Sequence, residues 1–239
     1  MNWKEWTALL YPPECPVCQK LLSDTEDRRR HIHGDCYRKL RRIVEPMCKR
    51  CGKPLLSAQQ EYCYDCGRKE HYFERGVAGF EYSSTMKQSM YSFKYNNRRE
   101  YAKYYAGVIV KNWKRVIKTW NAEALVPIPI SKSRYRKRGY NQAEILATEL
   151  ARLLNIPVAS DVIKRIKNTL PQKNLDDKTR YLNLNNAFQI ANSVVEYKSV
   201  ILVDDIYTTG ATMDSCSRPL KDNGVKWVYF ISACVGRGF

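Results

Sequence analysis

Apolar and polar residues follow two spacings along residues 76–239, and these spacings predict a series of strands and helices. The stretch 76–84 (GVAGFEYSS) alternates as a strand does, whereas apolar and aromatic residues from 86 to 120 recur every three or four positions, as on one helix face. Asn96 and Asn97 interrupt this pattern and predict two helices instead of one. Residues 124–130 (ALVPIPI) then predict a short buried strand, and 141–155 an amphipathic helix.

The C-terminal part continues this alternation. The apolar run 200–203 (VILV) predicts a central strand, 210–224 a helix, and 225–235 a final strand. Pro219 lies inside this helix, where it is expected to kink the helix or end it early. The polar stretch 168–188 predicts a long loop. Strands that alternate with helices predict an α/β fold, a parallel sheet flanked by helices, with functional groups at the carboxyl ends of the strands.

Cysteine spacing sets the N-terminal part apart, because seven of the nine cysteines fall between positions 15 and 66. A Cys-x-x-Cys turn supplies two thiolates, half of a tetrahedral zinc site, and a second such pair about a dozen residues later supplies the rest. One pair is completed by a histidine. The predicted zinc ligands are Cys15, Cys18, His33 and Cys36 for one site, and Cys48, Cys51, Cys63 and Cys66 for the other.

The spacing leaves open whether the four pairs combine in sequence or interleave, and His31 could replace His33 only by breaking the spacing. Disulfides are the alternative, which a cytoplasmic location disfavours. We expect that location because the chain has no signal peptide and no apolar run long enough to span a membrane. Eight ligands for two ions leave no open position, so the zinc is expected to be structural. Cys216 and Cys234 are expected to be buried apolar residues.

Two units follow from this pattern: a double zinc-ribbon module at 1–70 and a larger domain at 76–239, joined by a polar linker. The module is too short to build much core, so bound zinc should supply most of its folding free energy.

The positive charge is concentrated in one segment. The net charge is +17, and residues 76–140 hold 14 Lys and Arg against 3 Asp and Glu. Such a field attracts polyanions, either a phosphorylated small molecule or a nucleic acid, although a basic surface without a ligand is the alternative. Residues 94–107 (KYNNRREYAKYYAG) interleave cations with tyrosines, as single-strand grooves do. The helical spacing of these tyrosines nevertheless makes core packing the default expectation.

The stretch 200–212 (VILVDDIYTTGAT) places two carboxylates at the end of a buried strand, followed by hydroxyls and a glycine. Unpaired backbone N–H groups at the start of the next helix favour a phosphate. Two adjacent carboxylates suit a ribose diol or a nearby Mg²⁺. Together they predict a ribose 5-phosphate site, with the diol on Asp204 and Asp205 and the phosphate on Thr208, Thr209, Gly210 and Thr212.

This stretch resembles the phosphoribosyl pyrophosphate signature of type I phosphoribosyltransferases. Together with 126–147 (VPIPISKSRYRKRGYNQAEILA) and the tandem cysteine pairs, it makes the whole chain resemble the ComF family of bacterial competence proteins. The family joins a zinc-ribbon module to a phosphoribosyltransferase domain. His33 departs from the cysteine usual in relatives. The resemblance implies Mg²⁺ with phosphoribosyl pyrophosphate, and it adds Ala211 to the residues that hold the 5′-phosphate. It also implies diphosphate contacts from Arg134, Arg138, Asn141 and Gln142.

The resemblance also implies a flexible loop at 168–188 that covers the site, with Gln172 and Arg180 as further candidates. Glutaminase activity is not expected, because residue 2 is Asn2 and not a cysteine nucleophile. The implied role is DNA uptake in natural transformation, with contacts to single-stranded DNA and to competence-machinery proteins. No residue stands out as a general base. A sensor of phosphoribosyl pyrophosphate without turnover, and a phosphoribosyltransferase of nucleotide metabolism, therefore stay open as alternatives.

Overall fold

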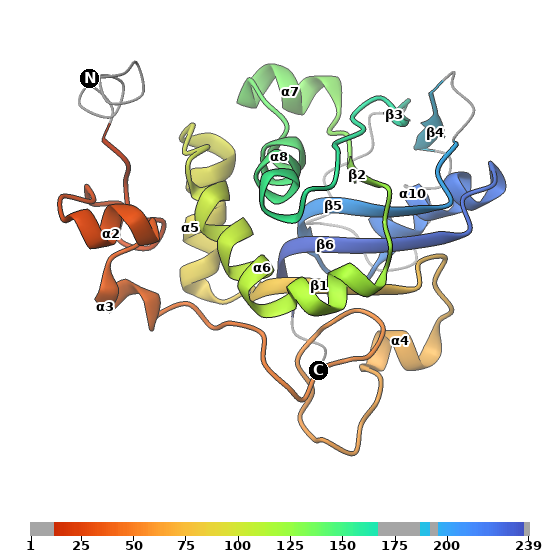
Figure 1. Cartoon of the computed structure of the whole chain (residues 1–239), viewed down its shortest axis with the longest axis horizontal. Helices are drawn as coiled ribbons and strands as arrows, with labels where there is room; N and C mark the ends of the chain where they lie inside the picture. The colour runs from red at the N-terminus through yellow and green to blue at the C-terminus, as the bar shows by residue number, and fades with distance from the viewer. Residues whose placement is uncertain (1–11, 167–186, 192–195, 237–239) are drawn as a thin grey trace.

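A computed structural model of the chain describes residues 12–166, 187–191 and 196–236 (Figure 1). Its centre is a sheet of four parallel strands, which confirms the predicted architecture. In spatial order the strands are β1 (Arg75–Glu81), β6 (Trp227–Val235), β5 (Ser199–Tyr207) and β2 (Ala124–Pro127). A parallel bridge from Leu125 to Val158 extends the β2 edge.

Helices cover both faces of this sheet, as a doubly wound α/β fold requires. In Figure 1 they lie along the sheet, α6 and α8 packed against each other on one side and α10 against β5 and β6 on the other. The described helices of this domain are α5 (Ser84–Tyr95), α6 (Tyr101–Thr119), α7 (Lys132–Arg138), α8 (Gln142–Leu154) and α10 (Ala211–Asp222). Among the described residues, no helix combines the length and hydropathy that a membrane crossing requires.

The predicted break near Asn96 and Asn97 is confirmed, because α5 ends at Tyr95 and Asn97 has a positive φ of 55°. The aromatic stripe of α6 packs into the core: the side chains of Tyr101 and Tyr105 are buried. These rings therefore contribute to folding and are not available for base stacking.

The structure adds one helix that the sequence did not predict, and for another it excludes one of two expected effects of a proline. The basic stretch 132–138, for which no helix was predicted, forms α7, which begins where the Ser131 hydroxyl accepts a bond from the Arg134 N–H and ends at Gly139 (φ 77°). Pro219 does not end α10 early, since the helix continues to Asp222. The buried side chains of Cys216 and Leu220 hold this part of the helix against the sheet and offset the lost hydrogen bond.

A small antiparallel pair, β3 (Ile163–Arg165) and β4 (Phe188–Ile190), lies beside α10. Most of the predicted loop at 168–188, with Gln172 and Arg180, lies outside the described residues, and the final residue of that stretch opens β4.

The N-terminal module packs on the β1 edge of the sheet. Its short helices are α2 (Thr25–Arg30), α3 (Gly34–Tyr37) and α4 (Tyr64–Arg68). The Arg41 carbonyl accepts from the Glu81 N–H (2.8 Å), and the Ile43 N–H donates to the Gly79 carbonyl (3.2 Å), so this segment covers a strand edge that would otherwise be unpaired. Module and domain share one continuous hydrophobic cluster.

The expected polar linker between the two units is not a free connection. Phe73 is 1% exposed, and the side chain of His71 is fully buried against the start of α10.

Candidate functional site

The second cysteine set fits a structural zinc ion. The four sulfur atoms of Cys48, Cys51, Cys63 and Cys66 lie within 4.8 Å of one another, and the Cys51 and Cys63 sulfurs are 3.6 Å apart. Tetrahedral zinc with Zn–S bonds of about 2.3 Å places sulfurs about 3.8 Å apart. The pairs therefore combine in sequence along the chain and do not interleave.

The first set also converges, with His33 and not His31 as its nitrogen ligand. The ligand atoms of Cys15, Cys18, His33 and Cys36 lie within 4.8 Å of one another. His33 Nδ1 is 3.2 Å from the Cys18 sulfur, while Nε2 is 3.1 Å from the Leu21 carbonyl oxygen. A proton on Nε2, donated to this carbonyl, leaves Nδ1 free for a metal.

The remaining cysteines are not part of either cluster. Cys216 and Cys234 are fully buried, as expected, and all nine cysteines, each within the described residues, are free of disulfides.

The two adjacent carboxylates lie within β5, which extends past the predicted strand to Tyr207. Asp205 Oδ2 pairs with Lys94 Nζ at 2.9 Å, and both side chains are mostly buried (14% and 16% exposed). Asp204 Oδ1 accepts from the Asp205 N–H at 2.7 Å. Among the described residues, none donates a hydrogen bond to the second oxygen of either carboxylate.

This environment changes the ionisation of the pair. Burial, together with the neighbouring Asp205 carboxylate, raises the pKa of Asp204 to about 7, although the Asp205 N–H, Lys94 and Arg134 favour its charged form. Burial alone would lower the pKa of Lys94, but the Asp205 carboxylate outweighs it and raises that pKa above its ordinary value. The Asp204 carboxyl therefore titrates near neutral pH.

The turn after β5 has the geometry expected of a phosphate cradle. Gly210 adopts a left-handed conformation (φ 85°) and precedes α10, whose first N–H groups have no partner within the helix. A Cβ atom at Gly210 would lie 2.8 Å from the Tyr207 hydroxyl oxygen. Any other residue is therefore disfavoured here for two reasons, the positive φ and the steric clash of its side chain. Thr208 is exposed beside it.

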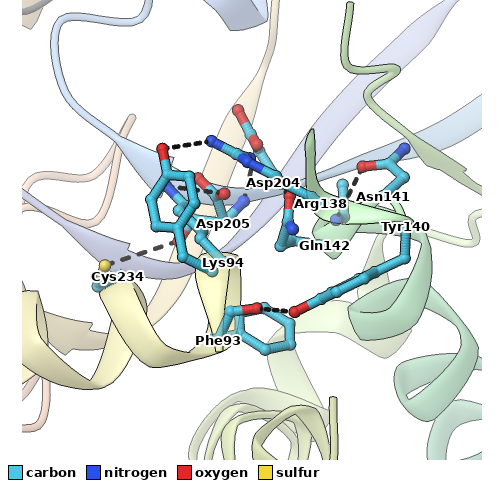
Figure 2. A network of polar contacts seen from close by, with 11 residues as sticks. Phe93, Lys94, Arg138, Tyr140, Asn141, Gln142, Asp204, Asp205 and Cys234 are labelled. Carbon is cyan, nitrogen blue, oxygen red and sulfur yellow. Dashed lines mark hydrogen bonds and ion pairs between the residues drawn. The ribbon is translucent and has the colours of Figure 1, made fainter. Parts of the chain in front are cut away.

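Most of the predicted diphosphate contacts gather near the carboxylates. The Arg138 guanidinium donates to Gln142 Oε1 at 2.7 Å (Figure 2), and its positive charge acts on Lys94, the partner of Asp205. The positive charge of Arg134 acts on Asp204. The Asn141 side chain is engaged structurally: it accepts from the Ala143 N–H and donates to the Ile128 carbonyl oxygen, each at 3.1 Å.

Sequence reasoning missed Lys94, which α5 places against the carboxylates (Figure 2). It also missed Tyr95, whose hydroxyl accepts from Arg138 at 3.0 Å. Both residues begin the stretch 94–107 that was noted for its cations and tyrosines, but nothing in that pattern connects them to the carboxylates, and the Lys94–Asp205 ion pair is a contact between distant parts of the chain.

Comparison with known proteins agrees with this organisation. Residues 6–67 match the double zinc ribbon domain, and residues 138–237 match the phosphoribosyl transferase domain. Competence protein F of Haemophilus influenzae is 35% identical over 76% of this chain and 81% of that protein, and competence protein ComFC of Bacillus subtilis is 30% identical over 79% and 77%. DNA utilization protein YhgH of Escherichia coli K12 is 26% identical over 81% and 86%. With a zinc-ribbon module and a phosphoribosyltransferase domain in this order, the chain belongs to the ComF family of competence proteins.

Proposed function

We propose that the carboxyl edge of β5 binds the ribose 5-phosphate unit of phosphoribosyl pyrophosphate. The observation that carries this proposal is the adjacency of two carboxylates and a left-handed glycine turn on one strand end. Asp204 and Asp205 each offer one oxygen to a ribose hydroxyl, and the amides around Gly210 accept the 5′-phosphate.

The diol binds the carboxylates directly in this proposal, without Mg²⁺ between them. Lys94 Nζ already neutralises Asp205 at 2.9 Å, and a second cation placed there would be repelled by it. Mg²⁺ then belongs with the diphosphate, whose charge it offsets. Arg134 and Arg138, in the first turn and at the last position of α7, are the proposed diphosphate contacts, because the Arg134 charge acts on Asp204 and Arg138 donates to Gln142. Gln142 joins them, while Asn141 contributes by fixing the start of α8.

Calorimetry on the zinc-loaded chain tests this site. Phosphoribosyl pyrophosphate with Mg²⁺ should bind the wild-type protein, and the Asp204→Asn, Asp205→Asn double variant should bind at least about tenfold more weakly, since each diol bond lost is worth about 1 kcal/mol. Asp222→Asn, which changes a side chain that is 66% exposed on α10, is the matched control and should bind as the wild type does. Equal affinity in all three proteins would refute the site.

Turnover separates a transferase from a sensor. With labelled phosphoribosyl pyrophosphate, a transferase releases diphosphate when a base or amine acceptor is supplied, whereas a sensor binds the sugar and releases none. Either result is compatible with the binding site, and the pair of measurements assigns the activity.

We also propose that this family member acts in DNA uptake or DNA utilization, in the cytoplasm and together with competence-machinery proteins, and that its basic surface contacts single-stranded DNA. The names of the relatives support the role. The surface is supported by α7: it carries five Lys and Arg in seven residues, and no described carboxylate lies within 4.0 Å of them. Affinity for a single strand should fall with salt, with a log–log slope of about −0.7 per phosphate contacted. A flat salt response would contradict the DNA contact.

A further inference from the structure

The segment that joins the second zinc site to β1, residues 69–72, is fixed to the helix that follows the glycine turn. Asp214, in the first turn of α10, has a side chain that is only 2% exposed. Its Oδ2 lies 2.9 Å from both Lys69 Nζ and His71 Nδ1, and its Oδ1 accepts from the Tyr72 N–H at 3.0 Å. A buried carboxylate without such donors would be costly, so these three bonds hold segment and helix together.

The same segment contacts the glycine turn itself. The His71 side chain is fully buried and stacks on Phe73, with ring centroids 4.6 Å apart. Its Cε1 lies 2.8 Å from the point that a Cβ atom on Gly210 would occupy, and the Tyr207 hydroxyl lies at the same distance from that point. The backbone at Gly210 therefore lies against the imidazole and the phenol, with no room for displacement toward either.

The second zinc site continues directly into these contacts. Cys66 lies within α4, and Lys69 follows directly after the last residue of that helix. Lys53, buried next to the same cysteines, pairs with Asp65 at 2.5 Å and lies over the Tyr207 ring, 5.7 Å from its centroid. Two chains of contacts thus run from the metal-binding module to the turn, one through His71 and one through Tyr207.

We propose that His71 and Asp214 fix the conformation of the phosphate-binding turn, so that the second zinc ribbon is a structural part of the sugar-phosphate site. The proposal rests on the function proposed above for the turn. His71 is a positioning residue: it acts through Asp214 and through contact with Gly210. A turn held in its bound conformation loses less conformational entropy when a ligand binds, and this raises affinity. The Asp214 N–H, which donates to the Gly210 carbonyl at 2.8 Å, transmits the same restraint along the backbone.

Three variants test whether His71 positions the turn at Gly210 or only helps the N-terminal module to pack on the domain. His71→Ala removes the ring and the donor to Asp214. His71→Asn keeps a donor close to the position of Nδ1 and should restore part of the effect. Glu70→Ala changes an exposed neighbour in the same segment and is the control. Each variant must retain the wild-type zinc content, measured by elemental analysis, so that loss of metal is not the cause of any change.

The first measurement is calorimetry with ribose 5-phosphate, which contains the diol and the 5′-phosphate but no diphosphate. We expect affinity to fall about tenfold in His71→Ala, by less in His71→Asn, and not at all in Glu70→Ala. If the wild type binds ribose 5-phosphate and His71→Ala binds it equally well, the proposed role of His71 is wrong while the proposed function stands. A wild-type protein that does not bind ribose 5-phosphate overturns the proposed function as well.

The second measurement needs no ligand. Backbone hydrogen exchange of the unliganded protein should become faster for residues 208–214 in His71→Ala while the central strands β5 and β6 keep their protection. If the substitution only loosened the contact between the N-terminal module and the domain, the increase in hydrogen exchange would not be confined to residues 208–214. Should His71→Ala fail to fold, Lys69→Met removes one ion pair from a side chain that is 40% exposed, and the same local increase is expected, smaller in size. Wild-type exchange at 208–214 in a folded variant overturns the proposal.

Discussion

The ionisation of Asp204 gives a quantitative test of the site in the absence of any ligand. In the folded protein, burial and the Asp205 carboxylate raise its pKa from 3.8 to about 7. The folded state therefore holds this proton over a pH range in which the unfolded chain has lost it, so stability contributed by the protonated group is lost as the pH rises toward 7. At about 1.36 kcal/mol per pKa unit, the wild-type protein should lose about 2 kcal/mol between about pH 5.5 and 8.5 from this group.

The perturbation is Asp204→Asn, which removes the titrating group and keeps its shape. The free energy of unfolding is measured by urea titration across that pH range, with zinc present, for the wild type, for Asp204→Asn and for the exposed control Asp222→Asn. The variant should lack the decline of about 2 kcal/mol, most of which falls below pH 7, and should gain stability relative to the wild type as the pH rises. The control should parallel the wild type.

Parallel pH profiles for the wild type and Asp204→Asn would refute this account of the carboxylates. They would mean that Asp204 is hydrated or paired well enough to ionise as it does in the unfolded chain, and that the strand end is not the buried acidic site described above.

Three further predictions concern the surroundings of the site. Lys94→Met leaves a mostly buried carboxylate unpaired and should lower the free energy of unfolding by about 3–5 kcal/mol in urea titration, whereas the exposed Lys87→Met should change it little; equal effects would contradict the ion pair. Gly210→Ala places a methyl group 2.8 Å from the neighbouring tyrosine hydroxyl at φ 85° and should cost about 1–3 kcal/mol in the same assay; a neutral result would contradict the crowded turn. Elemental analysis should find two zinc ions per chain, one in Cys51→Ser and two in Cys216→Ser; full zinc content in Cys51→Ser would contradict the second site.

Local pattern was sufficient for much of the fold. The apolar run 200–203 predicted the central strand because a strand buried on both faces needs apolar residues throughout, and the three- and four-residue spacing of 86–120 predicted two helices because each buries one face. The zinc ligands were predictable for a related reason: metal geometry imposes a spacing that can be recognised along the chain.

What the sequence concealed depends on contacts between distant residues. Helix α7 has no apolar face, so periodicity could not reveal it; only Ser131 before it and Gly139 after it signalled its ends. The residues around Lys94 do not indicate its ion pair with Asp205, because Asp205 lies more than a hundred positions later in the chain. His71 lies in a polar stretch typical of a linker, and its burial follows from a carboxylate on α10 that no spacing connects to it.

The most direct test of the central claim is a crystal structure of the zinc-loaded chain with phosphoribosyl pyrophosphate and Mg²⁺. The account predicts the 5′-phosphate within hydrogen-bonding distance of the backbone amides at 209–212, with the ribose hydroxyls on Asp204 and Asp205 and Lys94 still paired with Asp205. A sugar phosphate bound away from this turn, or one whose hydroxyls face neither carboxylate, would contradict it.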